Sequence, residues 1–172
     1  CPRCAAPAGP TRPDCPTESF WKQVQARARS VGALFVLDEN KTGFRLALPG
    51  AETFYGLAPD MVCFGKAIAN GFSVSALAGR AAVLDQGGIF QTERDRVFLL
   101  SATHGGETHA LAAAIKTVEI MRKEPVIPHM WEIGALLSRG FNAAAARAGV
   151  AERFELDGYG CFPALRVGAP GA

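Results

Sequence analysis

The sequence predicts an α/β fold with a mainly parallel sheet. A helical pattern, a glycine and a buried apolar run follow one another between residues 19 and 37, an order that is typical of α/β units. Two more short apolar runs, at 61–64 and 74–78, each lead into a glycine and then a charged residue. Long helical patterns follow from residue 107 onward. Strands and helices that alternate in this way build a sheet covered by helices.

The first half of the chain alternates between helix and strand. Ser19 is a suitable helix cap, and apolar residues at helical spacing follow it as far as Gly32, where we expect the helix to end. The continuous apolar runs that follow have the length of buried strands. We therefore expect strands at residues 34–37, 61–64 and 74–78.

The second half contains a further apolar run, a polar turn and two helical patterns. Residues 101–106 form a turn rich in hydroxyl groups and glycine. Pro125 and Pro128 interrupt the helical pattern, and Gly149 ends it. The expected elements are a strand at 98–100, helices at 107–122 and 129–148, and a strand, turn and strand over 154–167.

The composition narrows the class of protein. A formal net charge of +2, with both signs scattered along the chain, gives no support for nucleic-acid binding or for an acidic partner. No apolar run reaches the roughly 18 residues that span a bilayer, and the N-terminus lacks the basic start and apolar core of a signal peptide. We therefore expect a cytoplasmic protein with no membrane or nucleic-acid partner.

Residues 1–18 hold five prolines among small residues and are expected to be irregular. Cys1 and Cys4 form a CxxC pair, and Cys15 follows. A zinc site would need a fourth ligand at suitable spacing, and no histidine lies near. We therefore favour an irregular proline-rich segment over a metal site, and we expect reduced thiols from the odd count of five cysteines.

Charged residues follow the first two predicted strands. Asp38 and Glu39 come directly after the first, and Lys66 follows the second. The carboxyl ends of parallel strands form the rim where open α/β sheets bind ligands, so we expect these side chains on one rim. A lysine beside Gly65 and two apolar residues is expected to be buried, which would lower its pKa and favour a nucleophilic amine. The alternative is a lysine that extends from the strand end to water.

Asp38 and the turn at residues 101–106 also admit two interpretations each. A carboxylate facing a pyridine nitrogen would keep it protonated, whereas an acid at a strand end can simply cap the next turn. Thr103, Gly105 and Gly106 precede a helix, where backbone N–H groups bind phosphate readily. The alternative is an ordinary glycine-rich loop.

The remaining polar residues carry weaker signals. Arg45 and Arg80 follow strand ends and could bind an anion, or could be solvated charges. His104, His109 and His129 show no metal-ligand spacing with carboxylates, so we expect them to be structural or exposed, and we expect no metal site.

Several motifs together resemble a known family in both order and spacing over residues 19–123. They are Asp38-Glu39-Asn40-Lys41-Thr42-Gly43-Phe44-Arg45, Tyr55-Gly56-Leu57-Ala58-Pro59-Asp60, Cys63-Phe64-Gly65-Lys66-Ala67-Ile68-Ala69-Asn70-Gly71, Gly79-Arg80 and Thr103-His104-Gly105-Gly106. The chain resembles the class III aminotransferases, which are fold type I enzymes dependent on pyridoxal phosphate (PLP). Within that family it is most similar to the glutamate-1-semialdehyde 2,1-aminomutase group.

The resemblance implies a role for each matching residue. Lys66 would hold PLP as an internal aldimine and later move protons, and Asp38 would pair with the pyridine nitrogen. Glu39 would support the site from its edge, Asn40 would lie on the cofactor ring, and Thr103 would contact the phosphate of a neighbouring subunit. The activity implied is transamination or intramolecular amino transfer between small-molecule donors and acceptors, catalysed by a homodimer.

The resemblance also implies a domain organisation. Residues 19–123 would form the C-terminal half of the PLP-binding large domain, and residues 124–172 a linking helix and the beginning of a small α+β C-terminal domain. The family's chains are more than twice as long, so the chain is expected to be truncated. An inactive truncated remnant and a small α/β module that binds a phosphorylated ligand are therefore alternatives to an enzyme.

Three positions depart from the family's usual pattern. Asn40 stands where the family has Val, Ile or Met, and its amide could hydrogen-bond the cofactor or simply pack less well. Phe72-Ser73 stands in place of the usual proline, and Glu107-Thr108 replaces the usual Asn-Pro.

Overall fold

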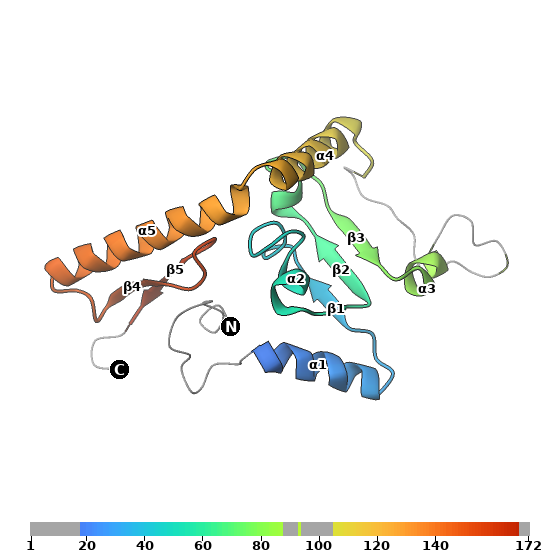
Figure 1. Cartoon of the computed structure of the whole chain (residues 1–172), viewed down its shortest axis with the longest axis horizontal. Helices are drawn as coiled ribbons and strands as arrows, with labels where there is room; N and C mark the ends of the chain where they lie inside the picture. The colour runs from blue at the N-terminus through green and yellow to red at the C-terminus, as the bar shows by residue number, and fades with distance from the viewer. Residues whose placement is uncertain (1–17, 88–92, 94–104, 169–172) are drawn as a thin grey trace. The chain divides into compact units, whose positions relative to one another are not determined.

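The computed structural model describes residues 18–87, 93 and 105–168 of the chain (Figure 1). The strand expected at 98–100 and nearly all of the N-terminal segment expected to be irregular lie outside the described residues.

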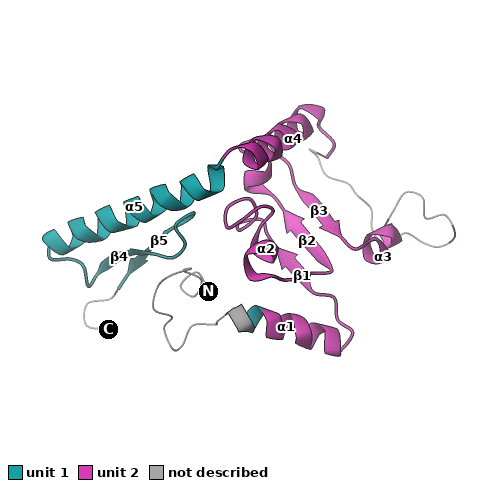
Figure 2. Cartoon of the chain, viewed as in Figure 1, with its two compact units in different colours: residues 1–21, 125–172 teal, residues 22–124 magenta. Residues whose placement is uncertain are grey.

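The chain divides into two compact units, which are described separately below. One unit comprises residues 22–124, and the other comprises residues 1–21 together with 125–172 (Figure 2). The assignment of these parts to a large and a small domain stays a prediction.

Residues 22–124 form a three-stranded sheet with helices. The helix that leads into this unit begins at residue 18, so Ser19, which was expected to cap it, lies within its first turn. The elements are α1 (Glu18–Ser30), β1 (Val36–Asp38), α2 (Ala51–Tyr55), β2 (Met61–Phe64), η2 (Lys66–Ile68), β3 (Ala76–Gly79), α3 (Ala81–Leu84), η3 (Asp85–Gly87) and α4 (Thr108–Lys123). The strands at the first two expected positions and the alanine-rich helix are therefore confirmed to within two residues.

The sheet is mixed, which corrects the expectation of a mainly parallel one. The strand order is β1-β2-β3, with β1 parallel and β3 antiparallel to β2 (Figure 1). The connection from β1 to β2 contains α2 and is long enough for a parallel crossover, whereas residues 65–75 are too few for one. The chain therefore turns back after β2, and β3 ends beside the start of β2.

One face of the sheet forms the core of this unit. Val62 and Phe64 alternate along β2 on the buried face, and the Phe64 ring lies 5.4 Å from that of Phe44, centroid to centroid. Partly buried apolar side chains from β1, the loops, η2 and α4 pack against these three residues: Leu37, Leu48, Ala67, Ile68, Val118 and Met121. The buried face thereby fixes the turn that follows β2.

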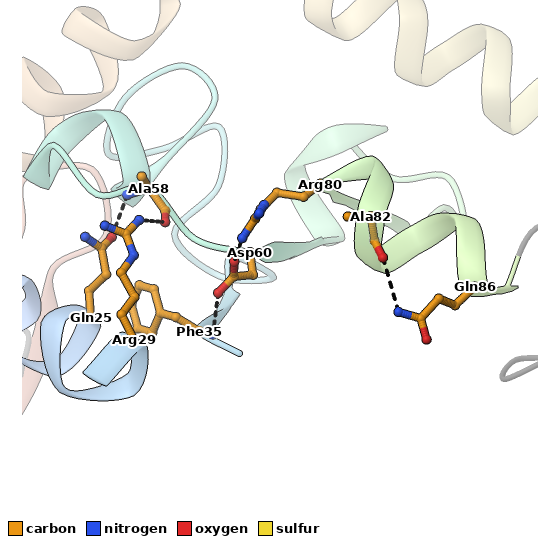
Figure 3. Close-up of polar contacts among 8 residues, drawn as sticks. All are labelled: Gln25, Arg29, Phe35, Ala58, Asp60, Arg80, Ala82 and Gln86. Atoms are coloured by element: carbon orange, nitrogen blue, oxygen red, sulfur yellow. Dashed lines mark hydrogen bonds and ion pairs between the residues drawn. The ribbon is translucent and has the colours of Figure 1, made fainter. Parts of the chain in front are cut away.

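The buried carboxylate of Asp60 joins the three strands at the other end of the sheet (Figure 3). Its Oδ2 accepts the Phe35 N–H at 2.9 Å, and its Oδ1 accepts a guanidinium N–H of Arg80 at 2.7 Å. The Arg80 N–H donates to the backbone oxygen of Asp60 at 3.0 Å. The hydrogen bond from the Phe35 N–H, and to a smaller extent the hydrogen bond from the Arg80 side chain, hold the pKa of Asp60 below its usual range.

Helix α1 is fastened to the same end of the sheet. An Arg29 guanidinium N–H donates to the carbonyl oxygen of Ala58 at 2.9 Å, and the Ala58 N–H donates to Oε1 of Gln25 at 2.6 Å (Figure 3). Side chains of α1 therefore satisfy both the N–H and the carbonyl group of Ala58, which lies two residues before Asp60.

The other unit consists of α5 (Val126–Arg147) and the antiparallel pair β4 (Phe154–Asp157) and β5 (Ala164–Val167). The expected strand, turn and strand are confirmed. The helix begins three residues earlier than expected, because Pro128 lies in its first turn, where a missing N–H breaks no helical hydrogen bond. The Asn142 side chain bonds the N–H of Leu156 at 2.8 Å and its carbonyl at 3.0 Å, which ties β4 to α5.

None of the helices in the described part of the chain has both the length and the apolar character that a membrane-spanning helix needs.

Candidate functional site

The charged rim lies at the carboxyl ends of β1 and β2. The parallel register pairs Asp38 with Cys63, and the Glu39 N–H donates to the Cys63 carbonyl at 2.8 Å. Both strands end at this point. The chain continues from β1 toward Asn40 and from β2 toward Lys66. The expectation that the two strand ends meet at one rim is confirmed.

Lys66 lies on this rim but is exposed, so the expectation of a buried lysine is wrong for this chain. The residues that follow it, Ala67 and Ile68, pack toward the core, while the lysine side chain remains in solvent. The backbone of Lys66 has φ of 49°, in the left-handed region that residues with a Cβ rarely adopt. Such conformations persist only where the surrounding structure imposes them, and they cluster at functional sites.

Asp38 is exposed on the same rim. Its Oδ1 accepts the N–H of Asn40 at 2.9 Å, so the capping of the following turn does occur. A carboxylate has room for several hydrogen bonds, and the cap therefore does not exclude a second partner. The two interpretations of Asp38 are compatible in this geometry.

Glu39 is fully buried, and its carboxylate is engaged within the loop that follows β1. Its Oε2 accepts the Thr42 hydroxyl at 2.5 Å, and its Oε1 accepts the Glu52 N–H at 3.0 Å. A Cβ on Gly50 would lie 2.5 Å from Oε2, so a larger residue there would require the Glu39 carboxylate to move. Glu39 therefore holds together the loop that follows β1, and both its support of a cofactor site and a direct cofactor contact stay predictions.

The charge of Glu39 also affects a neighbouring acid. Partial burial, and after it the negative charge of Glu39, raise the pKa of Glu52 above its ordinary value. Glu52 therefore sits at a position that disfavours its ionised form.

Asn40 is half-buried and lies against the turn that carries Lys66. A Cβ built on Gly65 would overlap the Oδ1 atom of Asn40, so the carboxamide approaches the backbone directly before Lys66. This contact could not be read from the sequence, although a glycine immediately before a strand-end lysine is a signal of close approach.

The remaining candidates lie elsewhere. Thr103 and His104 are outside the described residues, and so the expected phosphate contact stays a prediction. Arg80 belongs to the opposite rim through Asp60, and an Arg45 guanidinium N–H donates to the Lys41 carbonyl at 2.6 Å. The described positions of these two arginines fit structural roles better than an anion site at the charged rim.

Two of the residues that depart from the family pattern, Phe72 and Glu107, contact the same histidine, His109. The rings of Phe72 and His109 lie 5.7 Å apart, centroid to centroid, in an edge-to-face arrangement. His109 Nε2 also lies 3.5 Å from a carboxylate oxygen of Glu107. Phe72 and Glu107, which both depart from the family pattern, therefore both contact His109. Among the described residues, no group of His, Cys, Asp or Glu is arranged to hold a metal ion.

A comparison with models of protein families finds one match that covers most of the chain. The model named "Aminotransferase class-III" matches residues 14–164. The chain belongs to the class III aminotransferase family. Glutamate-1-semialdehyde 2,1-aminomutase from Neisseria meningitidis serogroup C is 34% identical over 149 residues, which cover 84% of this chain and 32% of the relative. The enzyme of the same name from Deinococcus deserti is 39% identical over 140 residues, covering 78% and 30%.

Solved structures agree with this assignment. A FumI protein from a Sphingopyxis species, determined in its PLP internal aldimine form, is 29% identical with a TM-score of 0.74, covering 87% of this chain and 34% of that one. An (S)-enantioselective omega-transaminase from Thermomicrobium roseum is 28% identical with a TM-score of 0.69, covering 89% and 33%. The fold type I assignment is confirmed, and the chain spans about a third of the length of these relatives.

Proposed function

We propose that this chain takes part in PLP-dependent amino transfer, as an aminotransferase or an aminomutase, with Lys66 as the residue that binds the cofactor covalently. The observation that carries the proposal is the parallel register of β1 and β2, which brings Asp38 and Lys66 to one rim. The family membership supports the same chemistry.

The residues of the rim fit PLP. An exposed amine and an exposed carboxylate match the aldehyde and the ring nitrogen of the cofactor. When bound, PLP supplies an electron-withdrawing ring that stabilises negative charge at the substrate carbon bearing the amino group.

This chain's own residues would then do three things. The Asp38 carboxylate would hold a proton on the ring nitrogen. The Lys66 Nζ would hold the cofactor covalently through its aldehyde carbon. The same amine, when free, would be the base that holds and moves a proton at the substrate carbon.

Further parts of the proposal rest on the sequence and on the family resemblance, without a contact in the described residues. They comprise a phosphate contact from Thr103, cofactor contacts of Glu39 and Asn40, small-molecule amino donors and acceptors, a homodimer and a cytoplasmic location. The similarity to aminomutases favours, for this chain, a substrate that carries both the amino group and its acceptor carbon in one molecule.

A titration with PLP tests the proposal. We expect a visible absorption band that grows and saturates with PLP, and that Lys66→Ala abolishes, while Lys41→Ala, a nearby exposed lysine, retains it. Absence of a saturable band, or an equal band in Lys66→Ala, would overturn the proposal for this chain. Binding of PLP that inorganic phosphate displaces, without any band, would instead support the phosphate-binding module.

A further inference from the structure

We propose that Asn40 is a positioning residue, whose carboxamide holds the Gly65–Lys66 turn and thereby sets how the Lys66 amine is presented. The inference rests on the proposed function of Lys66 and deepens it. It assigns a role to a residue that differs in polarity from the apolar residues usual at this place in the family.

The argument begins where the backbone pairing of β1 and β2 stops. The strand register ends at Asp38 and Cys63, and the last backbone bond joins Glu39 N–H to the Cys63 carbonyl. Beyond it, the contact between the two chain segments is made by a side chain, because Asn40 Oδ1 lies directly over Gly65.

Asn40 is itself held in place. Its N–H donates to Oδ1 of Asp38 at 2.9 Å, so its backbone is fixed to the other functional residue of the rim. Its side chain is half-buried, which restricts its rotamers. A fixed carboxamide pressing on a glycine can transmit the position of β1 to the turn after β2.

The turn needs such a constraint. Lys66 has φ of 49°, and a residue with a Cβ adopts this conformation only where its neighbours impose it. On the far side of Lys66, Ile68 is anchored by packing on the core and by its N–H, which donates to the Gly65 carbonyl at 3.3 Å. On the near side, Asn40 restrains Gly65. The exposed lysine is therefore held from both ends of its turn.

The fit at Gly65 is specific to Asn40. A Cβ on Gly65 overlaps Asn40 Oδ1, whereas the next atom of another residue that it would meet, the carbonyl oxygen of Val74, lies at an ordinary 4.0 Å. A substitution at Gly65 should therefore be harmful while Asn40 is present and better tolerated once its side chain is removed. This coupling is the signature of the proposed contact.

Reductive labelling measures the presentation of the amine. Lys66 Nζ forms a C=N bond with the PLP aldehyde carbon, releasing water, and borohydride then adds hydride to that carbon while solvent protonates the nitrogen. The stable pyridoxyl group is quantified by peptide mass spectrometry. Lys116, exposed on α4, is the internal reference, so each variant is described by the ratio of initial labelling rates at Lys66 and Lys116.

The expected pattern is non-additive. We expect Asn40→Ala and Gly65→Ala each to lower the ratio roughly tenfold, since displacement of a reacting group by a fraction of an ångström to an ångström has effects of this order. We expect the double variant to label faster than Gly65→Ala alone, because the overlap is relieved. Asn40→Ser, which shortens the side chain with less disturbance, provides a milder second variant.

Controls separate positioning from general stability. Asn142→Ala removes a half-buried asparagine that ties α5 to β4 in the other unit, so it should lower the melting temperature and leave the labelling ratio unchanged. All variants are compared at temperatures where circular dichroism shows them folded.

The outcomes are distinguishable. If the unmodified chain shows no preference for Lys66, the proposed function fails. If Lys66 is preferred but Asn40→Ala and Asn40→Ser leave the ratio unchanged, or the double variant shows the product of the two single effects, the role of Asn40 is overturned and the role of Lys66 stands.

Discussion

The two ends of the β1–β2–β3 sheet use their charged residues in opposite ways. At the end where β1 and β2 begin, Asp60 is buried and satisfied by Phe35 and Arg80. At the end where these strands finish, Asp38 and Lys66 are exposed, and Lys66 has a positive φ. The comparison shows that the charges of one end are used within the sheet, while those of the other end face solvent, where the proposed function places the chemistry.

The largest expected effect is at the exposed rim. Asp38→Asn should weaken PLP binding by roughly tenfold or more, because a charge-assisted hydrogen bond to the ring nitrogen is lost. The asparagine Oδ1 can still accept the Asn40 N–H, so the melting temperature should change little. Absorbance titration and thermal denaturation measure the two quantities. Unchanged PLP affinity would show that Asp38 only caps the turn.

The opposite rim should respond in the reverse way. Asp60→Asn should lower the melting temperature by several degrees, since the ion pair with Arg80 and an acceptor for buried donors are weakened. Arg80→Ala is the matched control and should have a smaller effect, because the Arg80 side chain is 66% exposed while Asp60 keeps the Phe35 N–H. Effects of equal size would contradict the view that burial of Asp60 is decisive.

The pH dependence of stability should single out the same carboxylate. Because the pKa of Asp60 is lowered on folding, its contribution is complete above its unfolded pKa of about 3.9 and is lost as pH falls through the lower folded value. Melting temperatures between neutral and acidic pH should therefore fall less steeply in Asp60→Asn than in the unmodified chain. Parallel curves for the two proteins would refute this assignment.

The smallest effect concerns the loop behind the exposed rim. The raised pKa of Glu52 means that its ionisation opposes folding, so the penalty is complete above the folded pKa and absent below the unfolded value of about 4.3. Glu52→Gln should slightly raise the melting temperature at neutral pH and have no such effect in acid. The Glu52 N–H bond to Glu39 is retained, which keeps the loop comparable.

The difference between the two rims also explains what the sequence could predict. The ends of β1 and β2 are predictable because each apolar run is followed within two residues by a charged residue, and parallel pairing brings such ends together. The orientation of β3 is not predictable from its apolar run, because such a run does not indicate in which direction the strand pairs. The short connection over residues 65–75 decides it.

Polar contacts between residues far apart in the sequence are the main feature of the structure that the sequence does not predict. Asp60 finds Phe35 and Arg80 at separations of 25 and 20 residues, and Glu39 finds Glu52 at a separation of 13. No local pattern encodes such partners. The exposure of Lys66 cannot be predicted from its apolar neighbours in sequence, because Ala67 and Ile68 turn toward the core and leave the lysine side chain in solvent.

Mapping the reductive label in the unmodified chain tests the central claim most directly. The chain is incubated with limiting PLP, reduced with borohydride, digested and analysed by peptide mass spectrometry. The account predicts that the pyridoxyl group is found predominantly on Lys66, with little on Lys22, Lys41, Lys116 or Lys123. Labelling spread evenly over these lysines, with no preference for Lys66, would contradict it.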